Sequence, residues 1–470
     1  MARGEWSPTE EKVLAGFYMR FISAARKLIS PSPRGIVAIP VKANWGPVNQ
    51  VVDIVEEGGL INNFGKDTGG DFTAYTTVNL AILGQPSKIL VYRLADGSEK
   101  KAAITLTGGT TPADALKLET VYPTDRNFNV TVRESLEGAG KQELILYEGT
   151  EQLSTYSFSN VDEAVAQINA DNVYITANKV ADGPLTVVSN QAFTGGNAGT
   201  TTITNEEYIK AMTAFEAKTF NAFALDGPAA ADLQTTVVGW VKRLRSQGKR
   251  IMAFLGGSLA DDKDPTIGNE RSKSFNHEGV INVTVSGELG GKLYPSGDIA
   301  AYVAGLTTSQ SLRESLTFAN TPFTDVQPAL TIEQRAEAVK SGSFILFEEE
   351  GVVKCERGIN TLTSYGENQD PSFSKIKLTR LKDSIDTDLS NLATQQYVGK
   401  LANHADGQAA LLSAIKAYFE TLAPDLITPD FIVQKDEELM KNAAKDQFFW
   451  EYYVTDVDNM EEIYGTGNHQ

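Results

Sequence analysis

The sequence contains very few of the residues that supply nucleophiles, disulfides and transition-metal ligands. Its 470 residues include one cysteine, Cys355, and three histidines, His277, His404 and His469. A single cysteine excludes an internal disulfide, which indicates a reducing compartment, and we interpret Cys355 as a small core residue. The histidines lack metal-ligand spacing, and no Gly-x-Ser-x-Gly motif is present. We therefore name no catalytic, cofactor-binding or metal-binding residue, and we expect no cofactor.

Long hydrophobic runs are also missing. No stretch approaches the roughly 18 consecutive apolar residues that would span a bilayer, so no membrane insertion is predicted. The start, Met1-Ala2-Arg3-Gly4-Glu5-Trp6, lacks the hydrophobic region of a signal peptide, so we expect the protein to stay in the cytosol where it is made. A hydrophobic content of 41% is ordinary for a soluble globular protein.

Positive charge is scarce, and it is unevenly placed. Lys and Arg total 42 against 60 Asp and Glu, a net charge of −18, which argues against binding to nucleic acid or to an anionic membrane. Residues 1–34 nevertheless carry six basic and three acidic residues, net +3, whereas residues 421–470 carry three and eleven, net −8. Opposite signs would steer the two ends together if they meet in different copies. Charge alone does not separate this reading from two solvated tails.

Aromatic and β-branched residues are concentrated at the two ends of the chain. The apolar runs at 13–22 and 448–457 favour strands, and neither has an obvious partner strand close by in the sequence. An unpaired strand presents free N–H and C=O groups to another chain, so these ends suggest a protein that polymerises. The candidate residues of such inter-subunit strand arms are Val13, Phe17, Met19, Phe21, Phe448, Trp450, Tyr452 and Val454. The candidate hinges are Pro31, Pro33 and Pro424.

The chain between these ends reads as α/β and α+β, in several domains. Residues 95–202 consist mostly of short strands bounded by Gly-rich joints, which indicates a β-rich insertion that projects from the surface. Strands at 220–225, 250–255 and 280–285 alternate with helices, which predicts a largely parallel sheet. We therefore divide the chain into an N-terminal arm (1–33), a first part of the core (34–94), the insertion (95–202), an α/β core (203–329), a C-terminal α+β domain (330–440) and a C-terminal strand arm (441–470).

Local signals predict several elements within these domains. Asn205 is expected to cap one helix and Thr331 another, and a hairpin is expected around Glu350-Gly351, with residues 359–362 continuing its sheet. The best place for a ligand lies beyond the carboxyl ends of parallel strands, where Asp226 and Gly256 end consecutive strands. Asp261, Asp262 and Asp264 follow, and we interpret them as a solvated loop.

The order of several short motifs resembles that of one known family. The opening strand at 13–21, the pair Arg34-Gly35-Ile36-Val37-Ala38 and Asn44-Trp45-Gly46-Pro47, and the Tyr122-Pro123 segment that leads to Phe128 each have a counterpart there. So does Leu293-Tyr294-Pro295-Ser296-Gly297-Asp298. Across nearly the whole chain the sequence is similar to contractile tail sheath proteins of phages and phage-tail-like bacteriocins, particularly the compact Gram-positive type.

The resemblance implies a non-enzymatic structural subunit that stacks as hexameric rings around a tail tube and contracts to drive the tube through a cell envelope. It implies partners as well: further copies of the chain, a tail tube protein, and baseplate and tail terminator proteins. It places the protein in a virion tail or bacteriocin particle, assembled in the bacterial cytoplasm. Two alternatives stay open, a nucleotide- or metal-binding α/β enzyme and a surface adhesin module.

Overall fold

The computed structural model describes residues 2–4, 16–18, 34–67, 69, 71–136, 138 and 140–469. The chain forms two compact units. Unit 1 comprises Met1–Ser32 and Ser384–Asp458, and unit 2 comprises Pro33–Asp383 and Asn459–Gln470. The chain therefore passes from unit 2 into unit 1 after Asp383 and returns to unit 2 at Asn459.

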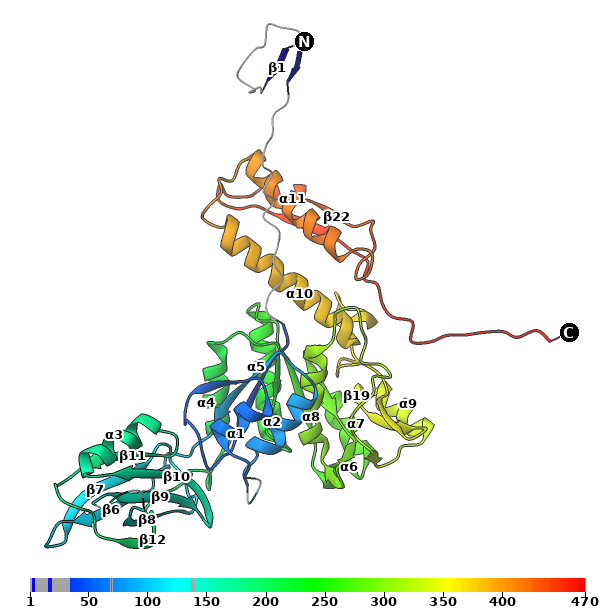
Figure 1. The fold of residues 1–470 in the computed structure, drawn as a ribbon. Helices are drawn as coiled ribbons and strands as arrows, with labels where there is room; N and C mark the ends of the chain where they lie inside the picture. The colour runs from blue at the N-terminus through cyan, green and yellow to red at the C-terminus, as the bar shows by residue number, and fades with distance from the viewer. Residues whose placement is uncertain are drawn as a thin grey trace. The chain divides into compact units, whose positions relative to one another are not determined.

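A seven-stranded sheet forms the centre of unit 2 (Figure 1). Its strand order is β19-β15-β14-β13-β3-β5-β4, and every neighbouring pair is parallel except β4 with β5. The strands are β3 (Ile36–Val41), β4 (Val51–Ile54), β5 (Lys88–Arg93), β13 (Ala222–Ala224), β14 (Met252–Gly256), β15 (Val280–Val283) and β19 (Ser343–Phe344). Because β3 and β13 pair directly, the sheet joins segments on both sides of the insertion, and the predicted largely parallel sheet is confirmed.

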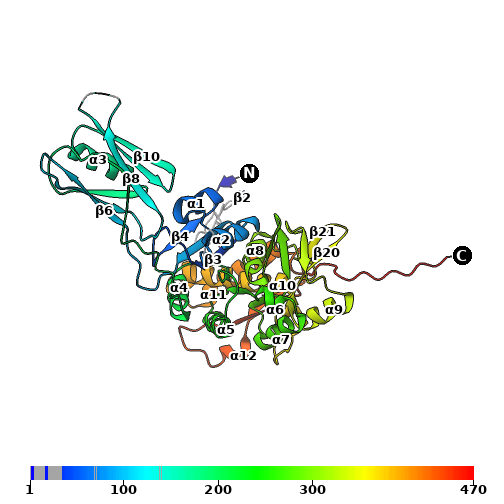
Figure 2. The ribbon, with the colours of Figure 1, turned by 90° about the horizontal axis from the view of Figure 1, so that it is seen from below.

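Helices cover both faces of this sheet, which explains why its central strands read as continuous apolar runs. One apolar core contains α1 (Glu57–Phe64), α2 (Ala74–Leu83) and α8 (Ser296–Ser309), and the other contains α4 (Asn205–Glu216) and α5 (Ala231–Ser246). Helices α2 and α8 lie side by side (Figures 1 and 2). A Cβ at Gly84 would lie 2.3 Å from the Leu306 nitrogen, so a glycine is needed at the end of α2.

Capping geometry confirms one predicted helix start and corrects another. Thr331 caps α9 (Ile332–Lys340) through a capping box with Gln334, as expected. The cap of α4 is Thr204 rather than Asn205. The Thr204 hydroxyl accepts from Glu206 N, and Thr204 N donates to the Glu207 carboxylate at 2.8 Å. Because this capping box includes the backbone of Thr204, the cap lies one residue before the predicted one.

Residues 95–202 fold as two facing sheets around their own apolar core. One sheet has the order β10-β9-β8-β12 and the other β11-β7-β6. The strands are β6 (Ala103–Gly108), β7 (Ala113–Thr120), β8 (Phe128–Glu134), β9 (Gln142–Glu148), β10 (Glu151–Phe158), β11 (Ile175–Lys179) and β12 (Val188–Ala192). Helix α3 (Val161–Asp171) is capped by Asn160, whose side chain accepts from Glu163 N.

Smaller elements complete unit 2. The list is α6 (Leu259–Asp262), α7 (Pro265–Phe275), β16 (Ser286–Leu289), β17 (Lys292–Tyr294), β18 (Asp325–Gln327), β20 (Leu346–Glu349), β21 (Val352–Cys355) and a 3₁₀ turn (Pro371–Ser374). The predicted hairpin around Glu350-Gly351 is confirmed by β20 and β21. The expected strand at 359–362 is wrong, because Asn360 and Thr361 direct their side chains to the main-chain carbonyls of Phe373 and His277 instead.

Cys355 is fully buried, and burial raises the pKa of its thiol to about 12. The interpretation of this cysteine as a core residue is confirmed.

Unit 1 holds the second part of α10 (Ile376–Leu392), a π-helical turn (Ala393–Tyr397) and α11 (Ala405–Leu422). It also holds β22 (Ile432–Lys435), α12 (Glu437–Met440) and β23 (Trp450–Tyr453). Helix α10 ends at Leu392, and the π-helical turn follows it directly. Near the N-terminus, β1 (Ala2–Gly4) and β2 (Gly16–Tyr18) pair in parallel.

Candidate functional site

The hairpin of β22 and β23 contains the C-terminal candidate residues. The strands are antiparallel, with Val433 opposite Tyr452 and Lys435 opposite Trp450. The expectation that this run has no partner strand nearby is therefore wrong. Phe448 and Val454 flank β23 on either side. Among the described residues β22 pairs only with β23, so β22 has one open edge.

Aromatic side chains hold the hairpin against α11. The Tyr452 ring lies 5.1 Å from the Phe419 ring and 5.9 Å from the Trp450 ring. Phe419 is fully buried, whereas Tyr452 and Tyr453 are 41% and 56% exposed. One part of the hairpin therefore packs on its own helix, while large aromatic surface stays available to a partner.

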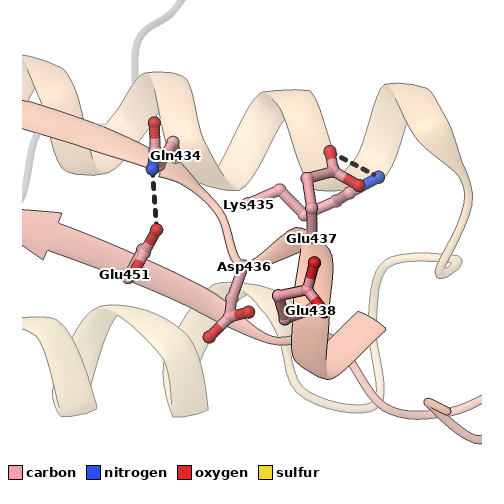
Figure 3. A pocket seen from close by; sticks show the side chains of 6 residues that line it. All are labelled: Gln434, Lys435, Asp436, Glu437, Glu438 and Glu451. Atoms are coloured by element: carbon pink, nitrogen blue, oxygen red, sulfur yellow. Dashed lines mark hydrogen bonds and ion pairs between the residues drawn. The ribbon is translucent and has the colours of Figure 1, made fainter. Parts of the chain in front are cut away.

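An acidic hollow lies beside this hairpin (Figure 3). It is lined by Gln434, Lys435, Asp436, Glu437, Glu438 and Glu451. Within it, Gln434 donates to Glu451 at 2.7 Å, and the Lys435 ammonium lies 3.1 Å from Glu437. Four carboxylates against one ammonium group make the hollow strongly negative.

The proposed hinge residue Pro424 precedes a segment that is tied to the C-terminal strand region. Ile427 is fully buried, Thr428 N donates to the Thr455 carbonyl, and Val457 N donates to the Leu426 carbonyl, both at 2.9 Å. Backbone hydrogen bonds thus extend beyond the hairpin on this side.

The N-terminal candidates are described only in part. Phe17 lies in β2 opposite Arg3 of β1, so residues 16–18 do have a nearby partner strand, contrary to expectation. Val13, Met19, Phe21, Pro31 and Pro33 lie outside the described residues.

The residues named for a ligand site at the strand ends are used for packing. The Asp226 carboxylate accepts from Thr73 Oγ1 and from the Tyr208 hydroxyl, both at 2.6 Å. Burial, followed by the charge of Asp226, raises the pKa of Tyr208. A Cβ on Gly256 would lie 2.3 Å from the Ser296 carbonyl carbon, so the start of α8 fills the space beyond β14.

The prediction that Asp261, Asp262 and Asp264 form a solvated loop is wrong for Asp262, which is buried, whereas Asp264 is exposed as expected. Asp261 completes a capping box at α6, and Asp264 caps α7. Asp262 is 3% exposed, and it accepts from Ser286 Oγ and Ser296 N, both at 2.7 Å, and from Ser296 Oγ at 2.5 Å. This acidic cluster organises helix starts.

The described part of the chain contains neither a metal-binding cluster nor a membrane-spanning helix. No three His, Cys, Asp or Glu side chains there are grouped so that they could hold a metal ion. No helix there is long and apolar enough to cross a membrane.

Four phage tail sheath family models match consecutive parts of the chain. They are the domain III N-terminal region of the tail sheath protein Gp18 (residues 34–94), the β-sandwich domain (95–205), the central domain (201–361) and the C-terminal domain (368–470). The chain belongs to the phage tail sheath family. It is a structural subunit of a contractile sheath, located in the tail of a phage or phage-like particle.

Individual relatives agree with this assignment. The sheath protein is 27% identical to the Bacillus subtilis protein YqbK over 99% of both chains. It is 29% identical to the tail sheath protein of Clostridium phage phiCD119, over 48% of this chain and 60% of that one. The crystal structure of a sheath tail protein from Desulfitobacterium hafniense matches with a TM-score of 0.73 and 24% identity, over 94% of this chain and all of the other, which shows the same fold.

The sheath protein also has a packed junction between its β-sandwich and its sheet, which the sequence did not reveal. The buried Arg93 at the end of β5 donates to the carbonyls of Gly46, Pro123 and Ala198 at 2.7, 3.0 and 2.9 Å. Burial lowers the pKa of Arg93 to about 10. Trp45 precedes β4 in the chain yet belongs to the core of the β-sandwich. The Gly-rich segment 194–199 is therefore held at Ala198.

A buried ion pair lies where the chain of the sheath protein leaves unit 2. Asp383 accepts from both terminal nitrogens of Arg245, at 2.7 and 2.8 Å, and Arg245 also pairs with Glu278 at 2.8 Å. The Arg245 side chain is 4% exposed. A bidentate pair in this setting holds the first part of α10 against the end of α5 within unit 2.

Proposed function

We propose that the protein polymerises with copies of itself as stacked hexameric rings around a tail tube, and that contraction of this sheath drives the tube through a target cell envelope. Membership of the tail sheath family over residues 34–361 and 368–470 is the observation that carries the proposal. The tail tube, baseplate and tail terminator proteins are its further partners. Assembly takes place in the bacterial cytoplasm, and the subunit performs no enzymatic reaction.

Strand addition at the open edge of β22 is the proposed means of linking subunits. This edge presents unpaired N–H and C=O groups, and a strand from another copy satisfies them. The N-terminal arm around Phe17 supplies that strand, and Trp450 and Tyr452 belong to the receiving hairpin. Pro31, Pro33 and Pro424 are the proposed hinges, and the domain division given from the sequence is retained.

Charge supports this choice of partner. The hollow lined by Glu437, Glu438 and Glu451 is negative, and residues 1–34 carry a net charge of +3. Opposite potentials accelerate encounter and suppress wrong pairings, and the effect weakens as salt screens it.

Contraction follows from the way such a polymer stores free energy. A heterologous contact that does not close generates a helical filament, and subunits with two packings permit an extended tube and a contracted one of lower energy. Strand links persist in both states while the contacts between cores, around residues 205–320, change. Contraction then needs no ATP, because the free energy is stored at assembly.

Electron microscopy of the purified protein tests the proposal. The full-length chain should form long, uniform, hollow tubes in negative stain, and a variant without residues 1–22 should remain monomeric. Monodisperse globular particles from the full chain, at any salt and up to high concentration, would contradict the proposed function.

A charge-reversal experiment tests the role of the hollow. Glu437→Lys with Glu438→Lys should slow tube formation, measured by light scattering at low salt, and the difference should shrink at high salt. The matched control reverses Glu134 and Glu151 in the β-sandwich, which are equally exposed strand residues. Equal slowing in both variants would show that net charge, rather than this surface, matters.

A further inference from the structure

The C-terminal segment of unit 2 carries a buried carboxylate in a site built for it. Glu461 is 7% exposed at its side chain. Its Oε1 accepts from Ser315 Oγ at 3.0 Å and Thr317 Oγ1 at 2.7 Å. Its Oε2 accepts from Lys375 Nζ at 3.0 Å and Arg357 Nε at 3.3 Å. Two hydroxyls and two cations therefore converge on one carboxylate, and these four residues are called the Glu461 socket below.

The socket is held together without the help of Glu461. Gly358 N donates to Thr317 Oγ1 at 3.0 Å, and Ile376 N donates to the Gly358 carbonyl at 2.9 Å. Ile359 and Lys375 form an isolated antiparallel bridge. The three segments that supply the socket are thus joined by hydrogen bonds that do not involve Glu461, so the donors are pre-positioned for a carboxylate.

Apolar burial does not hold the segment in place. The side chains next to Glu461 point to solvent: Met460, Ile463 and Tyr464 are 88%, 81% and 88% exposed. Glu462 pairs with Arg357 at 3.2 Å but remains 56% exposed at its side chain. Glu461 therefore anchors residues 460–464 of this segment to unit 2.

Glu461 lies close to a point where the chain passes from one unit to the other. The chain leaves unit 2 after Asp383, which is bound by Arg245, and returns at Asn459, two residues before Glu461. A buried carboxylate held by basic side chains thus lies close to each end of the unit 1 segment 384–458.

We propose that Glu461 is a latch that binds the socket of its own chain and fastens the returning C-terminal segment to unit 2. With the latch closed, the segment 384–458 is fastened to unit 2 at both of its ends. With the latch open, that segment is held at its α10 end alone, and the residues that follow Glu461 are released. The proposed latch depends on the contacts within one chain, and any role it has in tail assembly rests on the proposed function.

A nitroxide label at residue 463 tests the latch in the full-length chain. Ile463 is 81% exposed, and the natural Cys355 is fully buried. A thiol reagent therefore labels the cysteine of the Ile463→Cys variant rather than Cys355. The label should be immobilised in the parent protein. Adding Glu461→Gln should raise the mobile fraction of the label by about fivefold or more, because the charge-assisted hydrogen bonds to the Glu461 carboxylate are lost. Adding Glu462→Gln, the matched control, should leave the spectrum close to that of the parent.

Exchanging the charges of residues 375 and 461 distinguishes the loss of this ion pair from a general folding defect. Lys375→Glu alone should release the label, and Lys375→Glu with Glu461→Lys should restore at least part of the immobilisation. Equal mobility in the parent and the Glu461→Gln variant would overturn the proposal. So would immobilisation that disappears on dilution, because the socket would then be filled by another copy. Failure of the parent to form tubes would count against the proposed function alone.

Discussion

The Arg93 guanidinium donates to the main-chain carbonyl of Ala198 at 2.9 Å, across 105 residues of sequence. The same side chain binds the carbonyls of Gly46 and Pro123. It thereby joins the last long strand before the β-sandwich to the segment by which the chain returns from it. One buried side chain fixes both crossings of the insertion, because each carbonyl it satisfies comes from a different part of the chain.

Replacing Arg93 should loosen this junction. We expect Arg93→Met to lower the free energy of unfolding by about 2–4 kcal/mol, because three buried carbonyls lose a charged donor. Urea titration followed by circular dichroism measures the change. The control is Arg133→Met, whose side chain is 52% exposed and pairs with Glu143, and its effect should stay below about 1 kcal/mol. Equal effects of the two substitutions would contradict the assigned role.

Trp45 should be among the most important core residues of the β-sandwich although it lies outside that segment of the chain. Its ring lies 5.3 Å from the Tyr122 ring and 5.6 Å from the Phe128 ring, and Arg126 lies 5.0 Å from its centroid. Trp45→Ala should cost about 3–5 kcal/mol. Thermal unfolding should show the loss, and Leu136→Ala, at a 91% exposed position, should not shift the transition.

Asp262 should be required for folding of the core rather than for binding a ligand. Asp262→Ala leaves the Ser286 hydroxyl and the Ser296 N–H and hydroxyl without their acceptor, which should cost about 2–4 kcal/mol. Urea titration compares it with Asp114→Ala, an exposed strand carboxylate. A destabilisation no larger than that of Asp114→Ala would argue against the assigned packing role.

His277 should make the protein less stable in acid. Burial, followed by the nearby Arg245 charge, lowers the pKa of His277 from 6.5 to about 4. The unfolded chain therefore takes up a proton at higher pH than the folded chain does, so stability falls as the pH drops from about 6.5 to about 4. We expect a loss of about 2 kcal/mol from this residue between pH 7 and pH 4.

Replacing the imidazole isolates that contribution. His277→Asn keeps an acceptor for Gly279 N, which now donates to His277 Nδ1 at 3.0 Å. Urea midpoints measured from pH 7 to pH 4 should fall less steeply in the variant than in the parent. Parallel curves for the two chains would contradict the prediction.

Features set by a few consecutive residues could be predicted from the sequence. Thr331 indicated a helix start, and Glu350-Gly351 indicated a hairpin turn. Each depends on local conformational preference and on the period of apolar side chains. The change from strand and helix alternation to short strands likewise marked the β-rich insertion before its sheets were known.

What the sequence alone determined is thus the type of most elements, the α/β character of the core and the family to which the order of motifs belongs. The tertiary structure decided which groups meet: that residues 450–453 pair with β22, that Asp262 is buried between two serines, that Trp45 joins the β-sandwich and that Glu461 has four donors. Such pairings depend on chain segments tens to hundreds of residues apart. No local pattern records them, since a carboxylate in the sequence looks the same whether water or a buried hydroxyl will surround it.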